Sequence, residues 1–157
     1  MKRFILLSIA TLSLYSASAQ IAHDGWRGPN RTGIYAETGL LKQWPEAGPA
    51  LLWESLEAGK GYSSPVVVGD RVYITGMSDD QSMEIFTAYT LDGKKLYSVP
   101  YSKPWDGQYP ETRTTPTIDN GKAYLISGAG QIVCINTLDG KILWSVDGAK
   151  QFARKTG

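Results

Sequence analysis

The residues that could carry out chemistry are few in this 157-residue chain, and they are scattered. The single cysteine, Cys134, lies in the apolar run Gln131–Ile135, where a thiol usually packs as a small buried hydrophobe. The single histidine, His23, has no metal-ligand spacing around it. A Ser/His/Asp arrangement would have to use this one histidine, which lies outside the repeated part of the sequence. These residues therefore predict neither a catalytic role nor a metal site.

The acidic and amide side chains fall mainly in predicted turns. Asp92, Asp139 and Asn120 each precede a glycine, and such dipeptides favour tight hairpin turns. A bound calcium ion needs about six to eight oxygen ligands. No cluster of Asp, Glu and Asn outside the turns offers them. The turns are sufficient to explain these three residues.

Three short segments match known motifs only in part. Gly59–Ser63 contains a glycine–lysine pair, yet it lacks the spacing of a phosphate-binding loop and precedes a predicted strand. Gly128–Gly130 lacks the third glycine of a dinucleotide fingerprint and lies in a predicted hairpin turn. Asn30–Thr32 matches a glycosylation acceptor, a pattern short enough to arise by chance. None of the three predicts a site.

The strongest signal in the sequence is an internal repeat. Residues 63–74 align with residues 114–125, which places two prolines and two tyrosines at a spacing of 51. Residues 89–94 align with residues 136–141 at a spacing of 47. The difference falls in the polar segment Ser78–Ser82, where a hairpin loop tolerates insertion. A period of this length is typical of propeller blades.

Each repeat predicts four short strands joined by turns. β-branched and aromatic residues dominate these segments, and no helical period competes over a long window. The predicted strands are residues 63–68, 71–77, 83–90 and 95–99 in the first repeat, and 115–119, 122–127, 131–136 and 142–146 in the second. Four strands per repeat predict an all-β fold, a β-propeller of four-stranded antiparallel blades.

A large aromatic residue closes each repeat, Tyr97 in the first and Trp144 in the second. Trp53 stands 44 residues before Tyr97 in a similar setting, so residues 49–56 are predicted as the closing strand of another blade. Packing between blades explains all three aromatic side chains. A ring needs at least about four blades, so we expect an incomplete ring and a longer protein beyond Gly157. The alternative is a small domain that completes itself by oligomerising.

The N-terminal residues predict a secretory signal peptide. Lys2 and Arg3 precede the apolar run Phe4–Tyr15, and Ala17–Ala19 fits the small-x-small cleavage pattern, which predicts cleavage before Gln20. The apolar run is shorter than the roughly 20 residues that span a bilayer. We therefore expect a periplasmic or secreted protein without a transmembrane segment in the mature chain. A signal anchor is the alternative.

Residues 20–48 form a lead rich in tryptophan, with Trp26, Arg27 and Trp44. Its glycine and proline spacing favours a strap packed over one propeller face, and a binding surface is the alternative. The predicted organisation is a signal peptide (1–19), a lead or strap (20–48) and a partial propeller (49–157), which comprises a closing strand (49–56), blades at 62–101 and 113–147 and a polar connector (148–157).

Charge gives little reason to expect nucleic acid or an anionic membrane as partner. Removal of residues 1–19 leaves 14 lysines and arginines against 15 aspartates and glutamates. The basic residues are scattered and form no run. A net charge so close to zero provides no electrostatic attraction to a polyanion.

The element Asp139–Trp144 resembles the repeat signature of the pyrroloquinoline-quinone-binding-like (PQQ-like) β-propeller family. The segments Gly25–Ile34 and Leu40–Pro45 are similar to the N-terminus of exported bacterial members. Together these similarities cover most of the mature chain. The resemblance implies a fold with several functions. Some relatives are quinoprotein dehydrogenases that oxidise alcohols or sugars with the quinone and a calcium ion, and others lack a cofactor, including an outer-membrane protein assembly scaffold.

The dehydrogenases of this family typically hold the quinone on a tryptophan beside a disulfide between adjacent cysteines, and this chain has only Cys134. We therefore expect a non-catalytic binding or scaffold module that presents loops to a protein or polymer partner in the cell envelope, with no cofactor evident in this segment. The alternative is a PQQ-dependent alcohol or sugar dehydrogenase whose quinone, calcium and catalytic residues lie mostly beyond Gly157. No catalytic or cofactor-binding residue is assigned, and the substrate, partner and blade number stay open.

Overall fold

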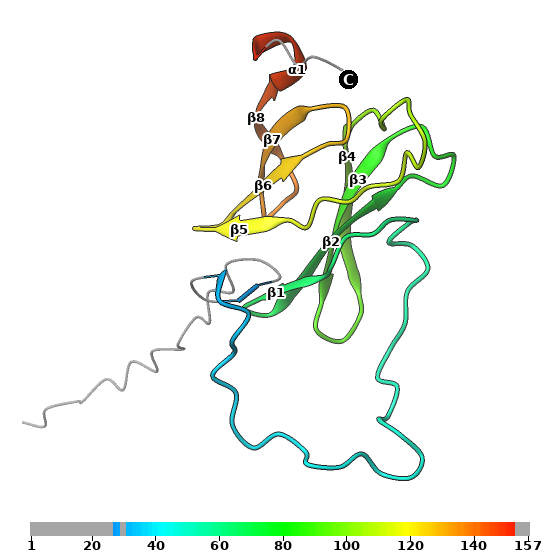
Figure 1. Ribbon diagram of the computed structural model, residues 1–157, viewed down its shortest axis with the longest axis vertical. Coiled ribbons are helices and arrows are strands. Elements are labelled where there is room, and N and C mark those ends of the chain that lie inside the picture. The colour runs from blue at the N-terminus through cyan, green and yellow to red at the C-terminus, as the bar shows by residue number, and fades with distance from the viewer. Residues whose placement is uncertain (1–26, 29–30, 153–157) are drawn as a thin grey trace, which may run out of the picture.

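The computed structural model describes residues 27–28 and 31–152 of the chain. The predicted signal peptide, His23 and Trp26 lie outside the described residues. Figure 1 shows the eight strands and the short helix of this part of the chain. They are β1 (Val66–Val68), β2 (Arg71–Met77), β3 (Glu84–Thr90), β4 (Lys95–Ser102), β5 (Thr117–Asp119), β6 (Lys122–Ile126), β7 (Gln131–Asn136), β8 (Ile142–Asp147) and α1 (Gly148–Gln151).

The strands form two four-stranded antiparallel sheets, in the orders β1-β2-β3-β4 and β5-β6-β7-β8. We call them blade one and blade two. The sequence repeat is reproduced in the register, because Val66 pairs with Tyr73 and Thr117 pairs with Tyr124 at the aligned positions. The all-β prediction and the four-stranded blades are thus confirmed, and the two sheets do not close into a barrel.

The first strand of each blade is shorter than predicted, with three residues. The residues before these strands make other hydrogen bonds instead. The Ser64 N–H donates to Thr115 Oγ1 at 3.1 Å and so connects the two blades, whereas Ser63 Oγ accepts from the Thr75 N–H of its own blade at 3.5 Å. Strand β4 is longer than predicted and ends at Ser102, because its last residues continue to pair with the start of β3.

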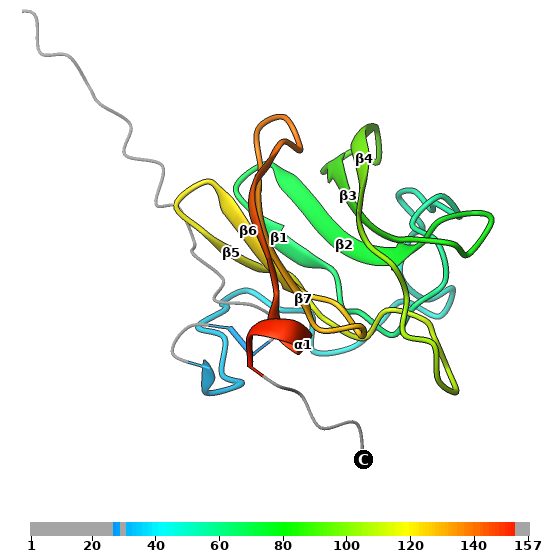
Figure 2. The same ribbon diagram turned by 90° about the horizontal axis from the view of Figure 1, so that it is seen from above.

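The two blades pack face to face around one apolar core (Figure 2). Phe86 is fully buried, and its ring stacks on that of Tyr73 with centroids 5.7 Å apart. A sheet buries its apolar face only against another layer, and each blade provides that layer for the other. The core cluster consists of Val66, Tyr73, Phe86, Ala88 and Tyr101 from blade one, and Ile118, Ala123, Leu125, Val133 and Ile135 from blade two.

The meander gives the pair of blades two different ends. The turn end carries the β1–β2, β3–β4, β5–β6 and β7–β8 hairpin turns. The loop end carries the β2–β3 and β6–β7 loops and the segments that lead into β1 and β5. The predicted turns are confirmed: Asn120 and Gly121 both have positive φ, and so do Gly93 and Gly140. Glycine and asparagine adopt this left-handed conformation most readily.

The lead does not pack as a strap in the described structure. Residues 31–48 are exposed apart from the half-buried Gly48, and they belong to a long loop that runs away from both sheets (Figure 1). Trp44 exposes 63 % of its surface. The glycines and prolines give the irregular path that was predicted, but the apolar side chains of this segment stay outside the core.

The predicted closing strand, residues 49–56, is a second correction, because these residues form no strand. A strand needs a neighbour to complete its hydrogen-bond ladder, and neither described sheet includes this segment. Its aromatic residue nevertheless reaches blade one. Trp53 stacks on Tyr89 with ring centroids 5.8 Å apart.

The predicted connector after blade two begins with the helix α1. Asp147 caps this single turn, since its carboxylate accepts from the Lys150 N–H at 3.0 Å and pairs with the Lys150 ammonium at 3.2 Å. Across residues 27–28 and 31–152, no helix has the length and apolar character that a bilayer crossing requires.

Candidate binding site between the blades

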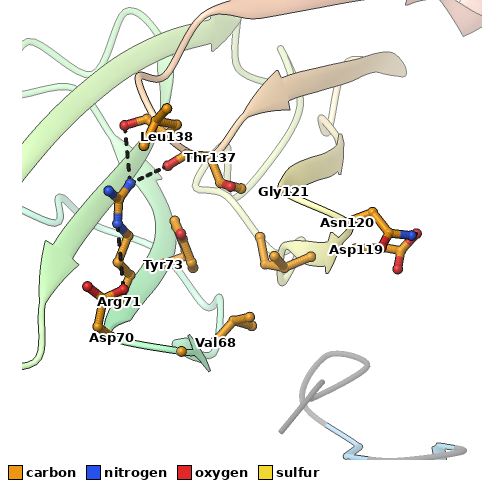
Figure 3. A pocket seen from close by; sticks show the side chains of 11 residues that line it. Val68, Asp70, Arg71, Tyr73, Asp119, Asn120, Gly121, Thr137 and Leu138 are labelled. Atoms are coloured by element: carbon orange, nitrogen blue, oxygen red, sulfur yellow. Dashed lines mark hydrogen bonds and ion pairs between the residues drawn. The ribbon is translucent and has the colours of Figure 1, made fainter. Parts of the chain in front are cut away.

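A cleft of about 460 Å³ opens between the blades at the turn end (Figure 3). The β1–β2 turn forms one side, and the β5–β6 turn and the start of the β7–β8 turn form the other. Tyr73 and Ile118, both nearly fully buried, provide an apolar lining that is continuous with the core. The volume lies within the range of roughly 300–1,000 Å³ that is typical of ligand pockets.

Arg71 is the cation of this cleft, and it ties the two blades together. Its Nη1 donates to the carbonyl of Thr137 at 2.6 Å and to that of Leu138 at 3.1 Å. Figure 3 shows the guanidinium reaching across from β2 to these carbonyls. The carboxylate of Asp70 lies 3.9 Å from Arg71 Nε and is 92 % exposed, so it contributes little to this contact.

The Thr137 carbonyl also accepts from the hydroxyl of Tyr97 at 2.8 Å. Burial raises the pKa of Tyr97, so the hydroxyl stays protonated and remains a donor. The same ring lies against Gly140, where an added Cβ would come within 2.8 Å of it. The aromatic residue that closes blade one therefore packs on the Asp-Gly turn of blade two.

Trp53 makes the equivalent contact with blade one. Its Nε1–H donates to the Leu91 carbonyl at 2.8 Å, and an added Cβ on Gly93 would come within 2.6 Å of its ring. Gly93 has a φ of +86° in the Asp-Gly turn between β3 and β4. The predicted packing between blades is thus confirmed for Tyr97, and Trp53 packs on blade one from a segment that forms no strand. Trp144, the third residue of that prediction, is 45 % exposed, and its ring contacts Tyr124 of its own blade.

Glu84 forms a second inter-blade connection near the loop end. It is 1 % exposed. Its Oε2 accepts from the Tyr101 hydroxyl at 2.6 Å, and its Oε1 accepts from the Gly128 N–H of blade two at 3.0 Å. Burial raises the pKa of this carboxyl group above its usual value, although the two hydrogen bonds act in the opposite direction. The group stabilises the junction of β3, β4 and the β6–β7 loop.

The chemistry that the cleft can perform is recognition of a polar group. The cleft offers one guanidinium, two turn carboxylates on Asp70 and Asp119, and an apolar lining. A catalytic nucleophile needs a base within hydrogen-bond reach, and the described lining residues do not form such a pair. Arg71 Nη1 is already engaged by two carbonyls, so only its Nη2 and Nε side remains for a ligand.

The donor set does not fit a quinone held with calcium. Within the described residues, no group of three or more His, Cys, Asp or Glu side chains could hold a metal ion. A calcium ion requires about six to eight oxygen ligands. Asp119 accepts from the neighbouring Asn120 amide at 3.1 Å, and the Asp70 side chain projects into solvent.

The candidate residues from the sequence, Asp92, Asp139 and Cys134, lie in hairpin turns or in the core. Asp139 accepts from the Lys141 N–H at 3.0 Å, and Asp92 accepts from the Thr90 hydroxyl, both inside hairpin turns. Cys134 is fully buried in β7, and burial raises the pKa of its thiol. A buried protonated thiol behaves as a small apolar side chain, as predicted.

The geometry of the repeats accords with a comparison to known proteins. A family model described as outer membrane protein assembly factor BamB, which consists of PQQ-like repeats, matches residues 29–153. The chain belongs to the PQQ-like β-propeller repeat family. The match extends across both blades and most of the lead. No curated protein matches the chain.

Sequence reasoning missed the two charged residues that join the blades. In the sequence, Arg71 is one of several scattered basic residues, and Glu84 lies within a predicted strand. A signal was present for Glu84, which stands in an apolar strand where the second repeat has the uncharged Gln131. For Arg71 the aligned residue is Lys122, so charge alone gave no distinction.

The aligned pair Arg71 and Lys122 provides a matched test of the inter-blade contact. Arg71→Met should lower the free energy of unfolding by about 1–2 kcal/mol, because the Leu138 carbonyl loses its charged donor. Lys122 is exposed, so Lys122→Met should change the free energy of unfolding by less than about 0.5 kcal/mol. Urea unfolding followed by tryptophan fluorescence measures both. Equal effects would contradict the role assigned to Arg71.

Proposed function

We propose that this chain belongs to an exported β-propeller module of the cell envelope, which holds a protein partner and performs no catalysis itself. The observation that carries the proposal is the family match across residues 29–153, since the matched family is described as an outer membrane protein assembly factor. The predicted signal peptide, with cleavage before Gln20, supports a periplasmic location or secretion. The proposal therefore includes both a protein partner and a location in the periplasm or outside the cell.

The way the blades are joined supports a scaffold. Polar connections lie at both ends of the blade pair, through Arg71 and Tyr97 at the turn end and through Glu84 near the loop end. Surface loops that are held by a rigid sheet framework are suited to recognition, because little conformational entropy is lost on binding. A quinone-dependent dehydrogenase receives no specific support from the described residues, since the charged groups of the cleft do not fit a calcium–quinone pair.

The proposal is tested on the full-length protein in the cells that produce it. We expect the protein in the envelope fraction, with Gln20 as its N-terminal residue and with a discrete protein attached after chemical cross-linking. Ala19→Asp removes the small residue at the cleavage point, so the uncleaved precursor should accumulate. N-terminal sequencing and cell fractionation provide the measurements.

Two results would contradict the proposed function. The purified full-length protein can be incubated with PQQ and calcium and assayed for quinone absorbance and for reduction of an artificial dye in the presence of alcohols or sugars. Calcium-dependent dye reduction would replace the scaffold proposal with a dehydrogenase. A cytoplasmic protein that retains residues 1–19 would contradict export.

A further inference from the structure

The loop end carries a connector loop that is longer than the linkage of blades requires. We define the connector loop as residues 103–113, between β4 and the segment that leads into β5. It is distinct from the polar connector, residues 148–157, that follows blade two. Pro116 follows Tyr97 by 19 residues, whereas Pro65 follows Trp53 by 12. In Figure 2 this loop, drawn in yellow-green, projects beyond the two sheets. The additional residues thus form a projection on the surface.

Both ends of the connector loop are fixed to the blades. Near its start, the Trp105 ring lies against Gly107, where an added Cβ would be 2.8 Å away, and the Trp105 Cβ lies 3.0 Å from the Cβ position of Gly128 in the β6–β7 loop. Near its end, Thr112 is 2 % exposed and forms a parallel bridge with Gly61. The tip of the loop, between these anchors, therefore has a defined position.

The tip presents a tyrosine in a strained conformation. Tyr109 has a φ of +59°, in the left-handed region that bulky side chains rarely adopt. Packing of its ring does not offset this strain, because 65 % of the residue is exposed. Arg113 maintains the conformation, since its Nη2 donates to the Tyr109 carbonyl at 2.8 Å. Such strain at an exposed position is typical of functional sites.

The neighbouring side chains indicate what this surface recognises. Tyr62 is also 65 % exposed, and its N–H donates to the Thr112 carbonyl at 2.7 Å, so it lies beside the same anchor. The Nε and Nη1 groups of the exposed Arg113 have no partner in the described part of the chain, and a charged guanidinium N–H donates a strong hydrogen bond to a carboxylate. Tyrosine and arginine are the residues enriched at binding hot spots.

From these observations we propose that the connector loop is the protein-binding surface of this module, and that it takes a partner segment with a carboxylate for Arg113 next to an apolar side chain for Tyr109. The proposal rests on the proposed function, which supplies a protein partner. The loop end is favoured over the turn end because Arg71, the cation of the cleft, already donates to two carbonyls of its own chain.

The experiment places the photoreactive amino acid p-benzoylphenylalanine at Tyr109 in the full-length protein, inside the cells that produce it. Irradiation should yield one discrete protein adduct, and peptide mapping should locate it beside an Asp or Glu residue. Arg113→Glu in the same chain should lower the adduct yield by at least about fivefold. As a matched control, the same probe at Leu138, which is 72 % exposed at the turn end, should yield no adduct.

Tyr109→Gly separates recognition from structure. Glycine adopts positive φ without strain, so this variant should be at least as stable as the native protein in thermal unfolding. With the probe placed at Tyr62, its adduct yield should still fall by about fivefold or more. A purely structural Tyr109 would give lower stability with an unchanged adduct yield, and that result would overturn the proposal.

The remaining outcomes distinguish this proposal from the proposed function. A protein adduct from Leu138 but none from Tyr109 would overturn the connector-loop proposal and leave a protein-binding scaffold in place. An adduct with glycan or lipid alone would overturn it as well. If neither probe gives an adduct and chemical cross-linking also finds no partner, the proposed function fails together with this inference.

Discussion

Replacement of Glu84 by alanine is expected to lower the free energy of unfolding by about 2–4 kcal/mol. The change removes the acceptor of the buried Tyr101 hydroxyl and of the Gly128 N–H, and these two donors lie in different blades. A buried donor that loses its acceptor retains the full desolvation cost. Urea unfolding at neutral pH measures the effect.

Glutamine at position 84 separates the hydrogen bonds from the charge. Its amide oxygen can accept from the Gly128 N–H, and its amide nitrogen can donate to the Tyr101 oxygen. We therefore expect Glu84→Gln to retain most of the stability that Glu84→Ala loses. Because the side chain no longer ionises, the variant should also remove one source of pH dependence.

The direction of that pH dependence follows from the raised pKa of Glu84. The folded state holds this proton more tightly than the unfolded state, so the stabilisation is complete below the ordinary pKa of 4.5. It is lost as the pH rises from that value through the pKa of the folded state. The melting temperature of Glu84→Gln relative to the native protein should thus increase between acid and mildly alkaline pH. A constant difference would show that the carboxyl group is not perturbed in the fold.

Gly140→Ala should lower the free energy of unfolding by about 2–4 kcal/mol, from positive-φ strain together with overpacking. The φ of Gly140 is +75°, and a Cβ there would lie 2.8 Å from the Tyr97 ring and 2.7 Å from Val99 Cγ2. Neither blade can adjust easily, because the Tyr97 hydroxyl is held by the Thr137 carbonyl.

Gly121→Ala is the matched control. Gly121 has a similar φ of +71°, but an added Cβ would have no neighbour closer than 3.9 Å. This variant should show only the conformational strain, about 1–2 kcal/mol. The difference between the two glycine variants measures the packing of blade one on blade two. In a Tyr97→Ala background the Gly140→Ala penalty should shrink, since only the Val99 contact remains. Equal penalties at the two glycines would contradict the inter-blade packing.

The strands could be predicted because the signals that form them are local. Runs of β-branched and aromatic residues form strands, and Asn-Gly or Asp-Gly dipeptides form hairpin turns, within a few residues along the chain. Strand β7 and strand β2 have the predicted bounds for this reason. The repeat shows the same pattern of strands and turns twice, and this identifies the blade as the repeating unit of the fold.

The contacts that Glu84 and Arg71 make between the blades could not be predicted, because their partners are distant backbone groups. Glu84 meets an N–H that lies 44 residues further along the chain, and Arg71 meets carbonyls 66 and 67 residues away. A backbone group has no distinctive residue type, so neither sequence pattern nor composition marks it. The conformation of Tyr109 was hidden for a similar reason, since nothing in its residue type favours a positive φ.

The contact of an aromatic side chain with a glycine turn joins two unlike surfaces. Trp53 packs on the Gly93 turn, and Tyr97 packs on the Gly140 turn, so each blade receives a ring at its turn and offers another from its last strand. Such an interface is heterologous, and it gives a row of blades a direction. Trp144, at the position aligned with Tyr97, is 45 % exposed on blade two. A unit that adds there must bring a glycine turn with an accessible carbonyl. The Gly140 turn of blade two is already covered by Tyr97, so a second copy of blade two cannot receive Trp144 on that turn.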